Sequence, residues 1–170
     1  MPGRYAATTA VDVERSQAEI RKTLKRYGAE ALGYGEDERV NAAMVVFRLA
    51  DRHYRVYVPL PDRADPQWRA TVTTPTIRAG AFRQAAYDQA MKQRWRAAAL
   101  YIKAVLEAAE SGIISVEQAL LTHLLLPNGQ TMGQATATPI EEMYQSGQMQ
   151  PLLPGLSQAQ LPTGRNTEAM

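Results

Sequence analysis

The chain has 170 residues, of which 21% are charged, and it contains no cysteine. This length fits one domain with a sizeable core, and the lack of cysteine excludes a disulfide scaffold or a thiolate metal site. The N-terminus lacks the apolar core of a signal peptide, and the apolar run at 120–126 is too short to cross a bilayer. We therefore expect a cytoplasmic protein with no membrane partner.

The charge is unevenly distributed along the chain. Up to Lys103 there are 18 Lys and Arg against 11 Asp and Glu, a net charge of +7, whereas the remainder carries one basic and six acidic residues, a net charge of −5. A basic front half favours a polyanionic partner such as nucleic acid. The alternative is that folding brings the two halves together and cancels the field.

A first helix is predicted after a flexible arm at residues 1–12. The run Ser16–Glu19 has the pattern of a capping box, which starts a helix, and Gly28 stops that helix after Tyr27. Ile20 and Leu24 then face the core. The outward face carries a basic cluster: Arg21, Lys22, Lys25 and Arg26.

Three antiparallel strands are predicted next. Residues 31–35 form an edge strand, and the strand 40–49 is followed by a tight turn at 50–52 and a returning strand. Alternation places one set of side chains in the core: Val45, Phe47, Leu49, Tyr54, Val56 and Val58. The opposite face displays Met44, Val46, Arg48, His53, Arg55 and Tyr57.

After a long loop at 61–80, in which Trp68 is expected to pack on the core, the run Ala81–Ser111 predicts one long helix that Gly112 ends. Its apolar stripe recurs at spacings of three and four: Tyr87, Met91, Trp95, Ala98, Ile102, Val105 and Ala109. The polar flank includes Lys92, Arg96 and Lys103, which are either a solvated face or a binding stripe.

The C-terminal part predicts a small helical extension with a hairpin-like turn. Ser115 begins a capping box for a helix that runs to about Leu124. Pro127–Gly129 contains Asn-Gly, which favours a type I′ turn. Thr138 caps a last helix, with Pro139 at its first position, and residues 156–170 are polar enough to be disordered.

These predicted helices and strands together indicate the α+β fold class, with one domain at 13–155.

No catalytic constellation stands out. The chain has only two histidines, His53 and His123, and lacks a phosphate-binding glycine loop followed by Lys-Ser/Thr. The acidic run Glu36–Glu38 is better explained as a solvated turn than as a cation site. We expect no metal and no cofactor, and nothing argues for an enzyme.

Five segments of the sequence carry a resemblance to known proteins: VERSQAEIRKTLKRYGAEALGYG, FRLADRHYRVYVPLPD, KQRWRAAALYIKAVLEAAESGI, LLPNGQTMGQ and PIEEMYQSGQMQPLLPG. With these, residues 13–155 resemble a family of small, uncharacterised bacteriophage and prophage proteins. The resemblance implies an accessory protein in the cytoplasm of an infected or lysogenic bacterium. It implies no activity and no catalytic residues.

Two functions remain open. The first is non-enzymatic binding of single-stranded or duplex nucleic acid, with Tyr57 as a stacking platform among cations. The order helix, three strands, helix also parallels the double-stranded-RNA-binding fold, by analogy alone. The candidate contact residues are Arg21, Lys22, Lys25, Arg26, Arg48, Arg55, Tyr57, Lys92, Arg96 and Lys103.

The alternative is a protein-binding module that blocks a host factor or forms a small phage assembly as a homo-oligomer. It draws on Leu100, on the apolar residues Met44 and Val46 of the outer strand face, and on the leucine-rich run 120–126.

Overall fold

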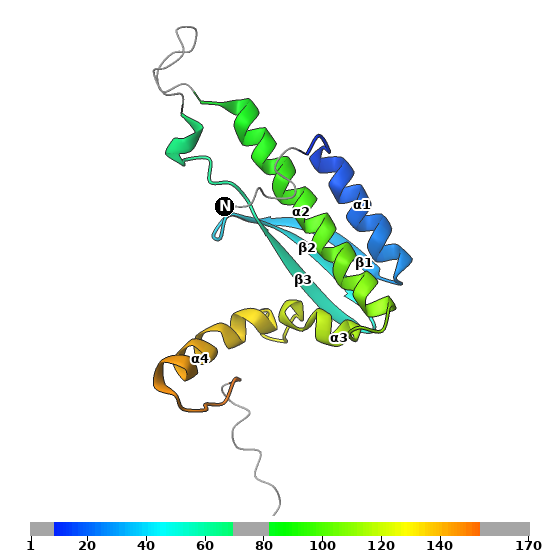
Figure 1. Cartoon of the computed structure of the whole chain (residues 1–170), viewed down its shortest axis with the longest axis vertical. Coiled ribbons are helices and arrows are strands. Elements are labelled where there is room, and N and C mark those ends of the chain that lie inside the picture. Colours follow the sequence, from blue (N-terminus) through cyan, green and yellow to red (C-terminus); the bar gives the residue numbers. More distant parts are fainter. Residues whose placement is uncertain (1–8, 70–81, 154–170) are drawn as a thin grey trace, which may run out of the picture.

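The computed structural model describes residues 9–69 and 82–153. The elements in chain order are α1 (Val13–Arg26), β1 (Glu30–Asp37), β2 (Ala42–Leu49), β3 (Arg52–Pro59), the short 3-10 helix η1 (Pro66–Trp68), α2 (Gln84–Glu110), α3 (Val116–Ala119), the 3-10 helix η2 (Leu121–His123) and α4 (Met132–Ser146) (Figure 1). The predicted α+β class and the order of its main elements are confirmed.

The three strands form an antiparallel meander in the order β1-β2-β3. Val45 of β2 lies opposite Tyr34 of β1 and Val56 of β3, so the inward residues of all three strands are in register. The turn between β2 and β3 has positive φ at both Ala50 and Asp51, as the tight hairpin turns that match strand twist require.

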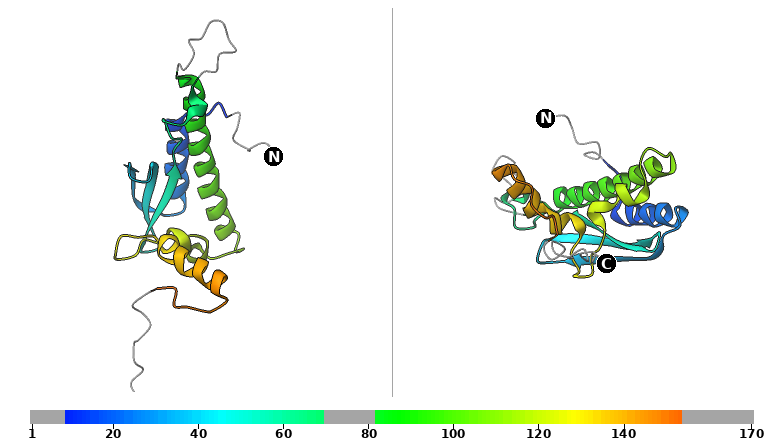
Figure 2. Two further views of the ribbon diagram at one scale, coloured as in Figure 1. Left: turned by 90° about the vertical axis from the view of Figure 1, so that its left-hand side faces the viewer. Right: turned by 90° about the horizontal axis from the view of Figure 1, so that it is seen from below.

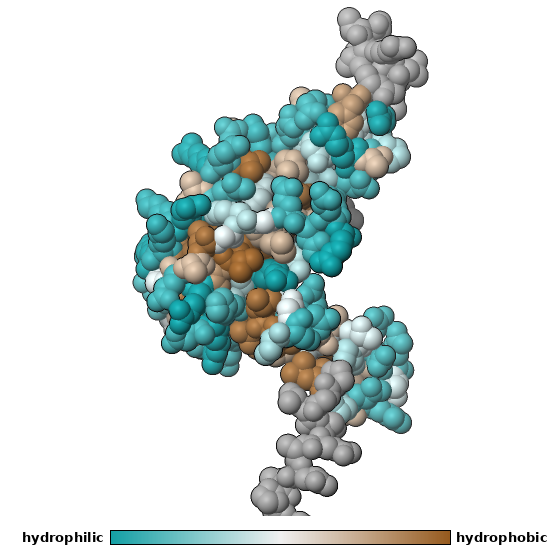
Figure 3. All heavy atoms as spheres, turned by 180° about the vertical axis from the view of Figure 1, so that it is seen from behind, coloured by the Kyte–Doolittle hydropathy of each residue, from teal (hydrophilic) through white to brown (hydrophobic). Residues whose placement is uncertain are grey.

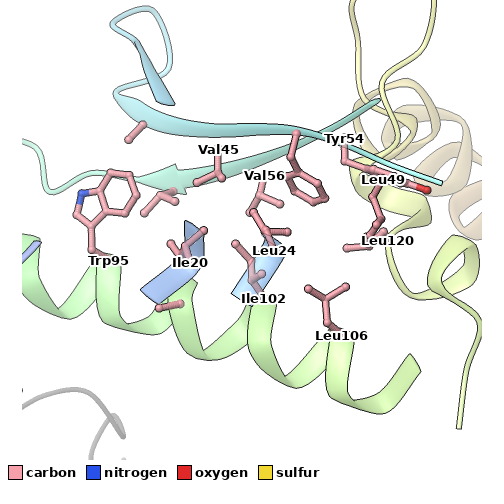
Figure 4. Close-up of a cluster of buried hydrophobic side chains, with 14 residues drawn as sticks. Ile20, Leu24, Val45, Leu49, Tyr54, Val56, Trp95, Ile102, Leu106 and Leu120 are labelled. Carbon is pink, nitrogen blue, oxygen red and sulfur yellow. The ribbon is translucent and has the colours of Figure 1, made fainter. Parts of the chain in front are cut away.

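Helices α1 and α2 cover one face of this sheet and leave its other face uncovered (Figure 2). The buried cluster between the two layers contains Ile20, Leu24, Ala43, Val45, Phe47, Leu49, Tyr54, Val56, Val58, Trp95, Ala99, Ile102, Leu106 and Leu120 (Figure 4). All six strand residues predicted to face the core are in it. Trp95 meets the ring of Tyr34 edge-on, with the ring centroids 6.0 Å apart.

The buried stripe of α2 differs by one residue from the predicted one at two positions. Ala99 and Leu106 are buried, whereas Ala98 and Val105 are only partly buried. α2 contacts α1 as well as the sheet, so its apolar face is wider than a single stripe. Side chains on the border between the two contacts stay half-covered.

α1 begins at Val13 with Asp12 as its N-cap, four residues before the predicted N-cap Ser16. Ser16 is fully buried inside the helix, so it cannot cap it. The N-cap is Asp12, whose carboxylate bonds to Lys92 of α2 instead of to the helix backbone. Because Gln89 also donates to the Thr9 carbonyl, residues 9–12 of the predicted flexible arm lie against α2.

The helix predicted from Ser115 does start with a capping box, but it ends at Ala119. Leu120 is buried in the core, and the chain then turns through η2. The hairpin-like turn is present, closed by Gly129 N–H donating to the Leu126 carbonyl. Pro127 is thus a central turn residue, and its fixed negative φ excludes the predicted type I′ geometry.

α4 begins at Met132, earlier than predicted. Thr131 is its N-cap and forms a complete capping box with Gln134. Thr138 and Pro139 therefore lie inside the helix, where proline removes one backbone hydrogen bond. The predicted end at Gly147 is confirmed, with φ 69°.

The two candidate caps give a direct test. We expect Thr131→Ala to destabilise α4 by about 1 kcal/mol, because the variant lacks the buried cap oxygen that accepts from Gln134 N–H. Thr138→Ala is the matched control and should have almost no effect, since this residue is exposed in mid-helix. Hydrogen exchange of the α4 amides measures both. Equal protection in the two variants would contradict the assigned helix start.

The loop after β3 packs on α2 where it is described. Trp68 is buried, donates from Nε1 to the Asp62 carbonyl at 2.7 Å, and meets Tyr87 edge-on, as predicted. Residues 1–8 of the predicted arm, residues 70–80 of the predicted loop and the whole predicted tail at 156–170 lie outside the described residues.

Candidate nucleic-acid interface

Ion pairs join α1 and α2 along most of their contact. Lys92 Nζ lies 2.6 Å from Asp12, Arg96 pairs with Glu19, and Arg26 lies within 3.6 Å of Glu110. The hydrogen bond between Lys92 and Asp12 raises the pKa of the lysine and lowers that of the carboxyl group. Lys92, Arg96 and Arg26 are therefore largely neutralised by carboxylates of the same molecule.

Three lysines on this side keep an unbalanced charge. Lys22 and Lys25 are exposed one turn apart on α1, and Lys103 is exposed on α2. Among the described residues none of the three makes an ion pair. We call these three residues the lysine face.

A shallow hollow of about 370 Å³ lies between the two helices at the lysine face. Lys22 and Thr23 line it from α1, and Lys103 lines it from α2. Glu19 and Glu107 also line the hollow, but Glu19 pairs with Arg96 and Glu107 lies 3.9 Å from Arg26. Two lysine ammonium groups facing one hollow from separate helices are suited to a bridging anion such as a phosphate.

The aromatic rings next to the lysine face are already engaged. Tyr27 donates its hydroxyl to Glu110 at 2.8 Å, and the guanidinium of Arg26 lies 5.5 Å from its ring centroid. Burial, together with this hydrogen bond, raises the pKa of Tyr27 to about 12. Arg21 lies over the ring of Tyr34 in the same way. This surface therefore offers charge, and neither ring is free to stack on a base.

The uncovered side of the sheet, which we call the outer sheet face, is turned toward the viewer in Figure 3. It carries the remaining candidates, because alternate side chains of β2 and β3 point away from the helices. Arg48 pairs with Glu30 and Asp51. The guanidinium of Arg55 donates to the Gly129 carbonyl and lies over the ring of Tyr57, 5.9 Å from its centroid. The predicted stacking platform is thus partly covered by its own arginine.

The predicted contact residues therefore lie on opposite sides of the molecule. Arg48, Arg55 and Tyr57 are on the outer sheet face, and the others are on the two-helix side. Sequence reasoning grouped them by charge and did not identify the carboxylates that pair with them. Asp12 and Glu19, seven residues apart on one helix face, were the available signal.

A larger groove of about 750 Å³ runs beside α2. Leu60, Trp68 and Leu100 supply much of its apolar lining, and Arg94 is the one basic residue among the described residues that line it. Asp62 and Asp65 also line this groove, so its charge does not complement a phosphate backbone. Leu100, which sequence reasoning proposed for a partner surface, lies here.

Comparisons with protein-family models, with curated proteins and with solved structures found no match for this chain. Within residues 9–69 and 82–153, no group of three or more His, Asp or Glu side chains is placed to hold a metal ion. No helix in the described part of the chain is long and apolar enough to span a membrane.

One histidine links the C-terminal part to the body. His123 Nε2 lies 2.7 Å from the Tyr101 hydroxyl, and the two rings meet edge-on. Burial lowers the pKa of His123, although a hydrogen bond with the Arg55 backbone acts in the opposite direction. The neutral ring is therefore the form that the fold favours.

This pKa shift predicts a loss of stability in acid. The unfolded chain takes up the proton at about pH 6.5, whereas the folded chain resists it. The stabilising contribution is complete above that pH and disappears as pH falls through the lower folded pKa. We expect His123→Gln to flatten the dependence of melting temperature on pH between about 7.5 and 5. If the melting temperature of the variant depended on pH as steeply as that of the wild type, other titrating groups would be the cause of the acid destabilisation.

Proposed function

We propose that this protein binds nucleic acid without catalysis, through phosphate contacts on the lysine face. The observation that carries the proposal is that Lys22 and Lys103 line one hollow from separate helices, and that neither they nor Lys25, one turn from Lys22, has an ion-pair partner among the described residues. The +7 charge of the chain up to Lys103 supports the same partner. A phosphate backbone matches three separated cations better than a single small anion does.

The engaged rings favour contact with phosphates over base stacking. Binding should therefore depend weakly on sequence, and duplex should bind at least as well as single strands because its charge density is higher. The parallel with the double-stranded-RNA-binding fold extends to three antiparallel strands with both helices on one face. That parallel concerns architecture alone.

The first experiment is an electrophoretic shift or fluorescence anisotropy titration with duplex and single-stranded DNA and RNA at several salt concentrations. For about three phosphate contacts, the slope of log K against log salt should be about −3 for duplex DNA and about −2 for single strands. Absence of binding to all four ligands at about 50 mM salt would refute the proposal.

We also propose the phage context. Its support is the set of sequence segments that resemble phage and prophage proteins. This resemblance implies a cytoplasmic accessory protein in a bacterial host. A protein that binds nucleic acid by charge suits such a role.

The alternative function, a protein-binding module, stays a prediction, but its expected surface changes. Leu120 is buried in the core, and Leu100 lines the groove beside α2 together with Leu60 and Trp68. Met44 and Val46 are half-buried on the outer sheet face. The more exposed apolar residues lie further along the chain.

A further inference from the structure

Exposed apolar side chains are concentrated in the C-terminal part of the described chain. Among large hydrophobic residues, the exposed ones are Val40, Tyr101, Ile113, Ile114, Leu121, Ile140, Tyr144, Met149 and Leu152. All but Val40 lie at 101–152. The segment 104–153 also contains no Lys or Arg. A surface of this kind repels a phosphate backbone and fits a protein partner.

α4 contacts the rest of the described chain mainly through η2. It has no buried residue, and it extends away from the two-layer body (Figure 1). At about 100° per residue, Gly133, Ala137, Ile140 and Tyr144 fall on one stripe of the helix. A Cβ at Gly133 would lie 3.0 Å from the Thr122 carbonyl, so the stripe begins in close contact with η2.

Beyond that first turn the described part of the chain covers the same stripe only in part. Ala137 is exposed, Ile140 is 40% exposed and Tyr144 is 88% exposed. We call Ala137, Ile140 and Tyr144 the α4 stripe. It carries no charge, since Glu142 lies on the opposite side of the helix and Glu141 only borders it.

We propose that the α4 stripe packs against the α4 stripe of a second copy of this chain, with the two helices antiparallel about a two-fold axis near Ile140. The stripe is complementary to itself in this arrangement. Ala137 and Tyr144 lie at similar distances on either side of Ile140, so each large tyrosine faces the small alanine of the other copy. Large residues opposite small ones are the packing that close helix contacts require.

The antiparallel direction also uses the neighbouring η2. The C-terminal turn of the partner helix would lie beside the start of α4, where Leu121 is 48% exposed. A buried aromatic residue covers on the order of 150–250 Å². Tyr144, Ile140 and Leu121 together thus supply on the order of half of the roughly 800 Å² per partner of a standard interface, an area that is typical of a weak, reversible dimer.

This inference is independent of nucleic-acid binding, and salt distinguishes the two. Phosphate contacts weaken as salt rises, whereas an apolar stripe bordered by Glu141 from both copies should hold or strengthen. Because the exposed side chains on this stripe stabilise the monomer little, their replacement should leave the melting temperature of a single copy almost unchanged.

The test is sedimentation velocity of the whole chain at about 1–200 μM. We expect a reversible dimer, and Tyr144→Ala should raise its dissociation constant roughly tenfold or more. Ile113→Ala is the matched control, because Ile113 is 79% exposed but lies outside α4; it should have no effect. A monomeric wild type, an unaffected Tyr144→Ala variant, or an equal effect of Ile113→Ala would each overturn the proposal.

A cross-linking experiment tests the direction of the helices, since the chain has no cysteine. Ala137→Cys and Tyr144→Cys variants, mixed and oxidised, should form the mixed disulfide dimer in preference to either symmetric one. A predominance of the symmetric Tyr144→Cys dimer would overturn the antiparallel arrangement.

Discussion

Trp95→Ala should lower the free energy of unfolding by about 3–5 kcal/mol, the usual cost of truncating a large buried aromatic residue. Trp95 is only 4% exposed and lies between α2 and β1, where its ring meets Tyr34 edge-on. Its removal leaves a cavity that the sheet and two helices cannot easily close. For a chain of this length the melting temperature should fall by roughly 6–20 °C.

The control is Tyr101→Ala, a comparable truncation on the same helix at a residue that is 40% exposed. It removes one hydrogen bond to His123 and should cost about 1 kcal/mol. Chemical denaturation measures both variants. If Trp95→Ala cost no more than Tyr101→Ala, the packing of α2 on the sheet would be misassigned.

The second large effect concerns the lysine face. Replacing Lys22 and Lys25 by Glu removes two positive charges, adds two negative ones and should abolish most nucleic-acid binding. The magnitude of the salt slope should fall by about 1 for each phosphate group that the variant no longer binds. Stability should barely change, because both side chains are exposed and have no ion-pair partner among the described residues.

Single reversals separate a local contact from the overall charge. Lys103→Glu and Arg39→Glu change the net charge equally, but Arg39 lies in the turn between β1 and β2, paired with Asp37. Lys103→Glu should weaken binding strongly and Arg39→Glu only slightly. Equal reductions in affinity would show that the protein attracts nucleic acid by net charge alone, without a site on the lysine face.

Tyr57→Ala distinguishes phosphate contact from stacking on the outer sheet face. Because Arg55 already lies over this ring, the lysine-face proposal predicts little change in single-strand affinity. A loss of about 1–3 kcal/mol in binding free energy would instead indicate that a base stacks there.

Local sequence patterns were enough to predict the elements and their inward faces. Strict alternation placed Val45, Phe47 and Val56 in the core, because a strand packed on one side permits only one register. Gly28 and Gly147 marked two helix ends, because both adopt positive φ, which other residues rarely do. These signals are local, so a single sequence was enough to read them.

Helix starts depend on long-range packing as well as on local pattern. Ser16 and Thr138 both have cap-like sequences, yet both lie inside helices. Ser16 is buried against the core, and the helix starts before it. The helix that contains Thr138 starts instead at Thr131, which forms the complete capping box. A cap contributes about 1 kcal/mol, which is too little to fix a boundary when packing favours another.

Which charges remain free follows from the packing of the helices alone. The sequence showed Lys92, Arg96 and Lys103 as equivalent cations on one flank of a helix. Packing α1 beside α2 set carboxylates next to the first two and left Lys103 without an ion pair among the described residues. Pairing across 77 to 80 residues depends on how two helices lie together, and no local pattern encodes it. The exposure of the α4 stripe is likewise decided by tertiary packing. The other described elements pack against one another and cover this stripe only in part.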